Sequence, residues 1–332
     1  MGYDYIAMIN FVVCFDENYN DEAYLFFHTL LKSVTEKIDI YIVHKNPSSF
    51  DHIKEKISSH EKLNKLEIYK FDYDLSTIKE TLYGHISEAT YYRLFLNRYL
   101  PDNLDYILYV DADVICYRDP IPLLKKEIQK LSKSEFIISA RTEVFREKKI
   151  EPHWERLSLK GERYFNAGVL LIDYQEWLKK DMSKILLEKM SEKKDILLYW
   201  DQDLMNMEID DKYVELSNSL NFDLFIAPDN VNRSLVEHYG QEALDNMCFL
   251  HYSGSMKPWT IRAAFNKRSI FYHDAYYELF KKKYKIVNTW KVSAVTQLLN
   301  GIFRFYIKNM RYPISFVYIA ILSLFKPSKT NE

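Results

Sequence analysis

The chain has 332 residues, which is too long for the smallest single-domain folds and suits one large α/β domain or a core with an appendage. Hydrophobic residues make up 48% and charged residues 28% of the chain, with only 7 Gly and 9 Pro, and this composition excludes collagen-like, low-complexity and disordered proteins. The net charge is −2, and the 3 cysteines are far apart with no CxxC spacing, which excludes a disulfide framework and a thiolate zinc site and favours a reducing compartment.

Apolar β-branched runs alternate with helical patterns along the chain. We expect strands at 9–15, 38–43, 66–71, 106–110, 136–140 and 167–172, and helices at 23–34, from about 51, at 89–99, 182–193 and 201–209. This alternation predicts βαβ units and a mostly parallel central sheet. The apolar run at 6–15 lacks a basic flank and is interrupted by Asn10, so it indicates a buried strand rather than a signal peptide.

The basic residues are concentrated at the end of the chain. Residues 281–332 contain ten Lys or Arg and one acidic residue, Glu332, so this segment carries +9 and the first 280 residues carry −11. Apolar residues at helical spacing from Val295 to Tyr306 indicate a basic amphipathic helix, and no stretch reaches the roughly 18 apolar residues of a membrane-spanning helix. We therefore expect a catalytic body at 1–280 and a helical, basic and aromatic tail at 281–332 that binds an anionic membrane surface rather than nucleic acid. The alternative is a helical hairpin packed on the body or on another subunit.

Acidic residues stand directly after two of the predicted strands. Ligands of an open α/β sheet bind beyond the carboxyl ends of its strands, where Asp16 and the pair Asp111 and Asp113 are expected. The Asp-x-Asp pattern occurs three times, but only this pair closes a five-residue apolar strand. Two carboxylates there predict an oxygen site for Mg²⁺ or Mn²⁺ bridging a diphosphate. An Asp-rich turn or helix cap is the alternative.

A second candidate segment runs from His251 to Trp259. Gly254 would let backbone N–H groups approach a phosphate, Lys257 supplies a positive charge, and His251 could complete a metal site. Taken alone, His251 is more typical of a structural imidazole, but the combination with Gly254 and Lys257 favours a ligand site.

A third candidate segment combines 164–173 with 200–203. Asn166 could hydrogen-bond sugar hydroxyl groups, and Asp201 with Gln202 would present a carboxylate and an amide from the start of a helix. The alternative is that Asp201 caps this helix and Gln202 is a solvated residue of its first turn.

Six segments, in this order and at these spacings, resemble glycosyltransferase family 8 over about residues 8–262. They are FDENY (15–19), HISEATYYRL (85–94), LYVDADV (108–114), YFNAGVLLID (164–173), WDQD (200–203) and HYSGSMKPW (251–259). The family comprises retaining, sugar-nucleotide-dependent enzymes, including bacterial galactosyl- and glucosyltransferases of lipopolysaccharide assembly.

The resemblance implies an α/β fold of the GT-A (Rossmann-like) type and a role for each matching residue. Mn²⁺ (or Mg²⁺) would be held by Asp111, Asp113 and His251. Cys14, Asp16 and Asn18 would lie at the nucleoside, and Arg93, Gly254 and Lys257 would face the diphosphate and donor sugar. Asn166 and Asp201 would bind the sugar. Gln202 would lie at the β-face of the anomeric carbon, and His85 would lie near the acceptor or donor. The chain departs from bacterial galactosyl members at Arg141-Thr142-Glu143, where they carry an Asp, which leaves the donor sugar and the acceptor contacts open.

These implications predict a hexosyltransferase that moves galactose or glucose from a UDP-sugar to a cell-envelope glycan or glycolipid. We expect it in the cytoplasm, peripherally bound to the inner face of the membrane. A homo-oligomer is possible. Gln202 is a poor nucleophile, so front-face attack is favoured over a covalent intermediate, with Asp201 and Lys257 as the other catalytic residues. Two alternatives are a sugar-phosphate nucleotidyltransferase, whose Gly-rich basic loop is missing after Phe15, and a non-catalytic glycan-binding module, which needs no metal ligands.

Overall fold

The computed structural model of the chain describes residues 8–75, 88–143, 153–224, 241–254, 256–260, 263–264, 266–284, 286 and 299. The chain divides into two compact units, one formed by residues 1–222 and 239–249 and the other by residues 223–238 and 250–332. Beyond residue 284 almost all of the predicted tail lies outside the described residues, so its helical form stays a prediction, as does the division at residue 280.

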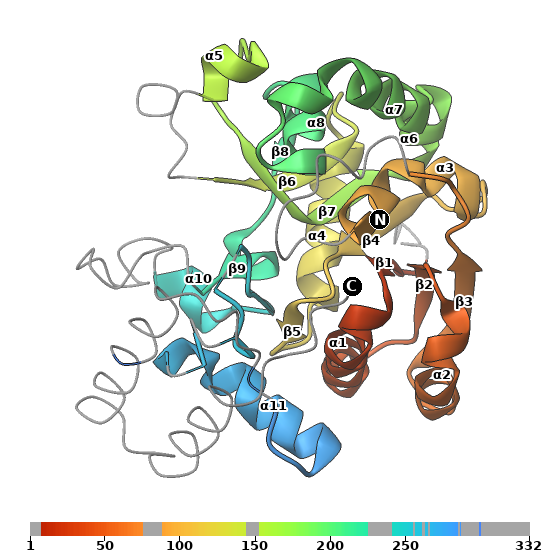
Figure 1. The fold of residues 1–332 in the computed structure, drawn as a ribbon, viewed down its shortest axis with the longest axis vertical. Helices are drawn as coiled ribbons and strands as arrows, with labels where there is room; N and C mark the ends of the chain where they lie inside the picture. The colour runs from red at the N-terminus through yellow and green to blue at the C-terminus, as the bar shows by residue number, and fades with distance from the viewer. Residues whose placement is uncertain are drawn as a thin grey trace, which may run out of the picture. The chain divides into compact units, whose positions relative to one another are not determined.

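The first unit is built around a seven-stranded sheet (Figure 1). Its strands in chain order are β1 (Asn10–Phe15), β2 (Ile38–His44), β3 (Leu63–Lys70), β4 (Tyr106–Val110), β6 (Ile138–Thr142), β7 (Phe165–Asp173) and β8 (Val214–Glu215). Their spatial order is β3-β2-β1-β4-β7-β6-β8, and all neighbours are parallel except that β7 is antiparallel to β4 and β6. The predicted mostly parallel sheet is therefore confirmed, and the antiparallel insertion of β7 is a feature that the alternation of elements did not predict.

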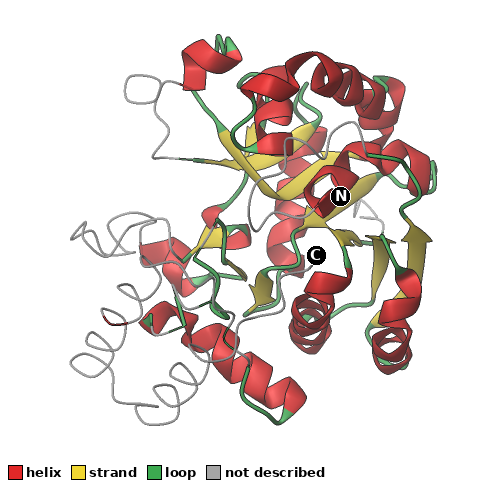
Figure 2. Cartoon of the chain, viewed as in Figure 1, coloured by secondary structure: helices red, strands yellow, loops and turns green. Residues whose placement is uncertain are grey.

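Helices cover both faces of this sheet (Figure 2). One face packs against α1 (Asn20–Ser33), α2 (Asp51–Ser58) and α4 (Ile121–Ser132), and the other packs against the 3₁₀ helix η4 (Glu88–Phe95), α3 (Leu96–Tyr99), α6 (Tyr174–Lys179), α7 (Met182–Lys193) and α8 (Trp200–Ile209). The short helices α5 (His153–Leu157) and α10 (Gln241–Asp245) complete the first unit. The predicted elements are present, with bounds that differ by up to three residues.

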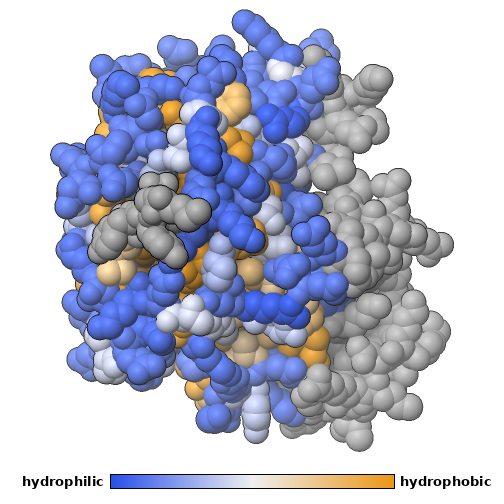
Figure 3. All heavy atoms as spheres, turned by 180° about the vertical axis from the view of Figure 1, so that it is seen from behind, coloured by the Kyte–Doolittle hydropathy of each residue, from blue (hydrophilic) through white to orange (hydrophobic). Residues whose placement is uncertain are grey.

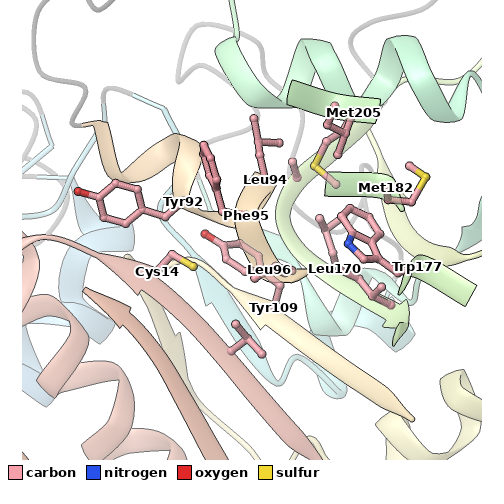
Figure 4. Packing of buried hydrophobic residues seen from close by; sticks show 14 of the residues in the cluster. Cys14, Tyr92, Leu94, Phe95, Leu96, Tyr109, Leu170, Trp177, Met182 and Met205 are labelled. Carbon is pink, nitrogen blue, oxygen red and sulfur yellow. The ribbon is translucent and has the colours of Figure 1, made fainter. Parts of the chain in front are cut away.

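Strand β1 shows why the sheet is buried on both faces. Successive side chains of a strand point to opposite faces, and in β1 both sets are apolar, so Phe11 and Val13 pack in one core cluster while Val12 and Cys14 pack in the other. Figure 4 shows part of the cluster that contains Cys14, where apolar side chains of several elements meet, among them Leu170 of β7, Trp177 of α6 and Met205 of α8. Full burial of each such side chain contributes about 1.5–3 kcal/mol relative to exposure.

The predicted helix at 89–99 is a different kind of helix in the structure. Its first part, η4, is a 3₁₀ helix of eight residues, and only Leu96–Tyr99 is α-helical. Side chains three residues apart eclipse one another in a 3₁₀ helix. The tighter winding therefore places Thr90 and Arg93 on the same edge, where both contact Asp201.

The second unit contains α11 (Ile270–Phe280). Three further short strands are β5 (Val114–Cys116) of the first unit and β9 (Phe222–Asp223) and β10 (Phe249–His251) at the boundaries of the two units. None of the helices within the described ranges is long and apolar enough to cross a membrane. The face of the molecule seen in Figure 3 is mostly hydrophilic, with apolar residues interspersed among polar ones.

Candidate active site

Strand β4 carries the first pair of acidic residues to the edge of the sheet. Tyr109 and Val110 at its end are buried, and Asp111 follows directly. The backbone N–H of Asp111 donates to the carbonyl oxygen of Gly168 at 2.8 Å, and the Tyr109 hydroxyl donates to Asp111 Oδ1 at 2.6 Å. Asp111 is thus fixed both by its backbone and by its carboxylate, as expected for a side chain at the carboxyl end of a central strand.

Arg93 of η4 connects this strand end to helix α8. Its side chain is only 7% exposed, and its guanidinium lies 2.9 Å from Asp111 Oδ1 through Nη2 and 2.9 Å from Asp201 Oδ2 through Nε. Nη1 donates to the carbonyl oxygen of Ala167, and the guanidinium stacks on the Tyr109 ring at 4.4 Å from its centroid. Burial alone would lower the pKa of Arg93, but Asp111 and Asp201 hold it above its ordinary value, so the guanidinium is a permanent positive charge between two carboxylates.

Asp201, in the first turn of α8, is more deeply buried than Asp111. The side chain of Asp201 is 4% exposed, against 25% for Asp111. Its Oδ1 accepts a hydrogen bond from Thr90 Oγ1 at 2.7 Å. Burial raises the pKa of the Asp201 carboxyl to about 6, and the opposing effects of Arg93 and Thr90 only partly offset this. Asp201 does not act as the N-cap of α8, which was the alternative interpretation of the sequence.

The first residues of β7 do not pair with β4. Side chains of α8 form hydrogen bonds with their backbone groups instead. Residues from Val169 onward pair with β4, whereas the Ala167 N–H donates to Gln202 Oε1 at 3.0 Å. Asn206 of α8 accepts from the Phe165 N–H at 2.8 Å and donates to the Phe165 carbonyl oxygen at 2.9 Å. Gln202 is therefore held against the sheet rather than solvated.

Asn166 of β7 is held by three hydrogen bonds. Its Nδ2 donates to Glu143 Oε1 at 2.7 Å, and its Oδ1 accepts from the Gly168 N–H at 3.0 Å and from Asn221 Nδ2 at 2.9 Å. Glu143 belongs to the segment that departs from the family pattern, and no sequence pattern predicts its contact with Asn166. The one signal that could have marked Glu143 as a site residue is its position just after a predicted strand.

The end of β1 places Cys14 and Asp16 at the same edge of the sheet as Asp111. Cys14 is buried, and burial raises the pKa of its thiol above the ordinary value. The Asp16 carboxylate accepts from the Asn18 N–H at 2.9 Å and so caps the 3₁₀ turn Glu17–Tyr19, while the Asn18 side chain is exposed. His85, which the family resemblance places near the acceptor or donor, lies outside the described residues.

In the second unit, the segment after β10 packs on α11. The Tyr252 hydroxyl accepts from the Tyr272 N–H and donates to the Arg268 carbonyl oxygen, both at 3.2 Å. Lys257 is 9% exposed, and its Nζ donates to the Tyr252 carbonyl oxygen at 2.7 Å. Gly254 has φ +63, a backbone conformation that side chains disfavour, which explains a glycine at this turn.

The residues predicted to bind a metal are two carboxylates and one imidazole. Asp111 and Asp113 follow β4 in the first unit, and His251 is the last residue of β10 and belongs to the second unit. Carboxylate oxygens suit Mg²⁺ and Mn²⁺, and imidazole suits transition metals, so the donor set fits a divalent cation without identifying it.

Comparison with known proteins gives consistent matches to sugar-transferring enzymes. Residues 10–263 match the family Glycosyl transferase family 8. The chain is 30% identical to a lipopolysaccharide 1,2-glucosyltransferase of Escherichia coli (strain K12) over 176 residues, 52% of this chain and 49% of that protein. It is 29% identical to the lipopolysaccharide 1,3-galactosyltransferase of Salmonella typhimurium over 185 residues, again 52% of this chain and 49% of that protein. The matched region thus spans about half the length of these relatives.

The solved structures extend the likeness to the fold. The galactosyltransferase LgtC in complex with donor and acceptor sugar analogues superposes with a TM-score of 0.62 at 22% identity, covering 80% of this chain and 95% of that one. The glycosyltransferase GlyE of Streptococcus pneumoniae TIGR4 gives a TM-score of 0.56 at 19% identity, covering 84% and 65%. The fold is of the GT-A type, as the sequence predicted.

Proposed function

The chain belongs to glycosyl transferase family 8, and on this premise we propose that it is a retaining hexosyltransferase that uses a UDP-sugar, with galactose and glucose as the candidate sugars. One observation carries the proposal: a single buried guanidinium, Arg93, joins Asp111 after β4 to Asp201 at the start of α8. The two segments are far apart in sequence and carry the carboxylates expected at a diphosphate and at a sugar. Their convergence supports one site for both parts of a sugar nucleotide.

We propose that Asp111, Asp113 and His251 bind a divalent cation, with Mn²⁺ as the first candidate, and the chemistry of two carboxylates and an imidazole supports this. When bound, such a cation stabilises the negative charge that develops on the departing nucleoside diphosphate. Lys257 would add a positive charge to the same group, since charge stabilisation at the leaving group lowers the barrier more than it favours the ground state. Arg93 holds Asp111 in place for this role. Cys14, Asp16 and Asn18 would then contact the nucleoside.

We propose that the reaction proceeds by front-face attack. The acceptor hydroxyl would bond to the anomeric carbon from the side that the diphosphate leaves, while the carbon–oxygen bond to UDP breaks and the acceptor proton passes to the departing diphosphate oxygen. Gln202 is the side chain expected at the opposite face, and its amide is a poor nucleophile, which argues against a covalent intermediate. Asp201 and Asn166 would bind sugar hydroxyl groups, and with a pKa of about 6 Asp201 is ionised at neutral pH.

We propose a cell-envelope glycan or glycolipid as acceptor, because two of the relatives reported above are a lipopolysaccharide 1,2-glucosyltransferase and a lipopolysaccharide 1,3-galactosyltransferase. The basic tail at 281–332 would bring the enzyme to the anionic surface where such an acceptor lies. This part of the proposal rests on the charge of the tail in the sequence.

A hydrolysis screen tests the proposal. The full chain is incubated with UDP-galactose, UDP-glucose, other sugar nucleotides, and a sugar phosphate with a nucleoside triphosphate, each with Mn²⁺, Mg²⁺ or EDTA. We expect slow release of UDP from one UDP-hexose with Mn²⁺ and none with EDTA. Turnover of the sugar phosphate and triphosphate instead would identify a nucleotidyltransferase and overturn the proposal.

A further inference from the structure

The Gln202 amide is held at both of its ends. Its oxygen accepts from the Ala167 N–H at 3.0 Å, and its Nε2 donates to the Tyr164 hydroxyl oxygen in a longer contact of 3.4 Å. A backbone N–H can only donate, so Ala167 determines which end of the amide carries the oxygen. The role of Tyr164 depends on where its own proton points.

The Tyr164 proton points away from Gln202. The Tyr164 hydroxyl donates to Asp203 Oδ1 at 2.6 Å, and an ionised carboxylate only accepts hydrogen bonds. Because Tyr164 has one proton and gives it to Asp203, its oxygen remains as an acceptor for Gln202 Nε2. Asp203 thereby fixes the direction of the Tyr164 O–H bond, and the Tyr164 oxygen reinforces the amide orientation that Ala167 requires.

Asp203 also shapes the chain that enters α8. Its Oδ2 accepts from the backbone N–H groups of Leu198 at 2.7 Å and Tyr199 at 2.9 Å, and from Arg156 Nη1 at 2.9 Å. The next residue, Trp200, has φ +45, a left-handed conformation that is rare and strained for a bulky side chain. The contacts of Asp203 hold this strained residue immediately before Asp201 and Gln202.

We propose that Tyr164 and Asp203 are positioning residues that orient the Gln202 amide for the transfer reaction, a proposal that rests on the function proposed above. Tyr164 is fully buried at the start of the segment leading into β7, and Asp203 is fully buried in α8. Neither was assigned a role from the sequence, where Asp203 is one member of an Asp-x-Asp pair that follows no strand. They act through Gln202 and need not touch the substrate.

Tyr164→Phe is the most selective test because it removes one oxygen atom and keeps the ring. We expect kcat for hydrolysis of the preferred UDP-hexose to fall about tenfold while the donor KM stays within about twofold, since misorientation affects the reaction more than binding. Tyr174→Phe is the matched control: Tyr174 is equally buried, and its hydroxyl donates to the Leu96 carbonyl oxygen at 3.1 Å, with no contact to Gln202. The control variant should keep wild-type kcat and lose a similar amount of thermal stability.

A double-mutant cycle separates positioning from a general loss of structure. If Tyr164 acts through Gln202, adding Tyr164→Phe to Gln202→Ala should change kcat by less than about twofold, because the group it orients is gone. An equal tenfold drop in both backgrounds would overturn the proposal, as would an unchanged kcat of Tyr164→Phe in an otherwise active enzyme. A wild-type chain that hydrolyses no UDP-hexose would instead overturn the proposed function, and the positioning role with it.

Discussion

Helix α8 buries two carboxylates two residues apart, and their surroundings shift the two pKa values in opposite directions. Burial raises the pKa of Asp201 to about 6. Burial also acts to raise the pKa of Asp203, but hydrogen bonds from Arg156, Tyr164 and the backbone of residues 198 and 199 hold it below its ordinary value. We call these two environments the Asp201 side and the Asp203 side of α8.

The difference lies in the number of donors. Asp203 receives four hydrogen bonds, from two side chains and two backbone N–H groups, whereas Asp201 has Thr90 and a share of Arg93, which Asp111 also uses. A buried carboxylate that is fully hydrogen-bonded stabilises the fold, and one that is incompletely compensated destabilises it. Groups of the second kind concentrate at functional sites, so the comparison supports the substrate-binding role proposed for Asp201 and a positioning and stabilising role for Asp203.

The largest effect is expected at the proposed metal ligands. Asp113→Asn should lower sugar transfer by about 10³-fold or more, because a bound cation supplies several kcal/mol of charge stabilisation. Asp72→Asn is the control, since it makes the same change in another Asp-x-Asp pair at an exposed site, where Asp72 pairs with Arg98. Initial rates with Mn²⁺ measure both variants. Near wild-type transfer by Asp113→Asn in the presence of EDTA would refute the metal site.

Gln202 lies between Asp201 and Asp203 in α8, and its replacement should give the next largest loss of activity. Gln202→Ala is expected to lower kcat by about 10- to 100-fold, because it removes a group that is fixed against β7 and that we propose faces the reacting carbon. The anomeric configuration of the product should not change, since front-face attack needs no protein nucleophile there. Initial rates measure kcat of this variant, and NMR of its product gives the anomeric configuration. An inverted product from this variant would point to a covalent role for Gln202.

Replacing each acid of α8 by its amide tests the comparison itself. Asp203→Asn should destabilise the protein by about 3 kcal/mol, because it leaves Arg156 and two backbone N–H groups without the charge that satisfies them. Asp201→Asn should stabilise the metal-free protein at neutral pH, because it removes an incompletely compensated buried charge. Urea unfolding in EDTA measures both free energies of unfolding. Equal destabilisation by the two variants would contradict the assignment of the two sides.

The pH dependence of stability sharpens the same test. The pKa of Asp201 is raised in the folded protein to about 6, from about 3.9 in an unfolded chain, so the folded state binds more protons between these values. The destabilisation caused by Asp201 is therefore absent below about pH 4 and grows as pH rises through the folded pKa, reaching about 3 kcal/mol above it. The stability advantage of Asp201→Asn should appear across the same window. A difference that does not vary between pH 4 and 7 would contradict the raised pKa.

Removal of the tail should have the smallest effect on the rate of donor hydrolysis. A chain ending at residue 280 should hydrolyse donor within about twofold of the wild-type rate, since every proposed site residue precedes residue 260. It should no longer float with anionic liposomes, because the tail's ten basic residues each contribute up to about 1 kcal/mol at such a surface. The full chain should float and be partly released by salt. Equal flotation of both proteins, or loss of folding on truncation, would support the packed hairpin instead.

The part of the site that sequence reasoning predicted is the part encoded locally. A short apolar run followed by acids indicates a buried strand and its end, which is why Asp16 and Asp111 were placed at the edge of the sheet. The start of α8 was predicted in the same way from its helical pattern. Local patterns do not report which distant residues meet.

The contacts that organise the site join residues far apart in sequence. Thr90 and Asp201 are separated by 111 residues, Tyr164 and Asp203 by 39, and Asn166 and Glu143 by 23. No periodicity or composition relates such pairs, because the antiparallel insertion of β7 and the 3₁₀ winding of η4 bring them together. Asp203 was therefore unassigned, although four donors converge on it.

The configuration of the first-formed product tests the central claim most directly. Hydrolysis of an α-linked UDP-hexose releases a free sugar. Proton NMR recorded before this sugar mutarotates distinguishes its two anomers through the coupling of the anomeric proton. Retention by front-face attack predicts the α anomer as the initial product of wild-type enzyme with Mn²⁺. An initial β anomer would contradict the account.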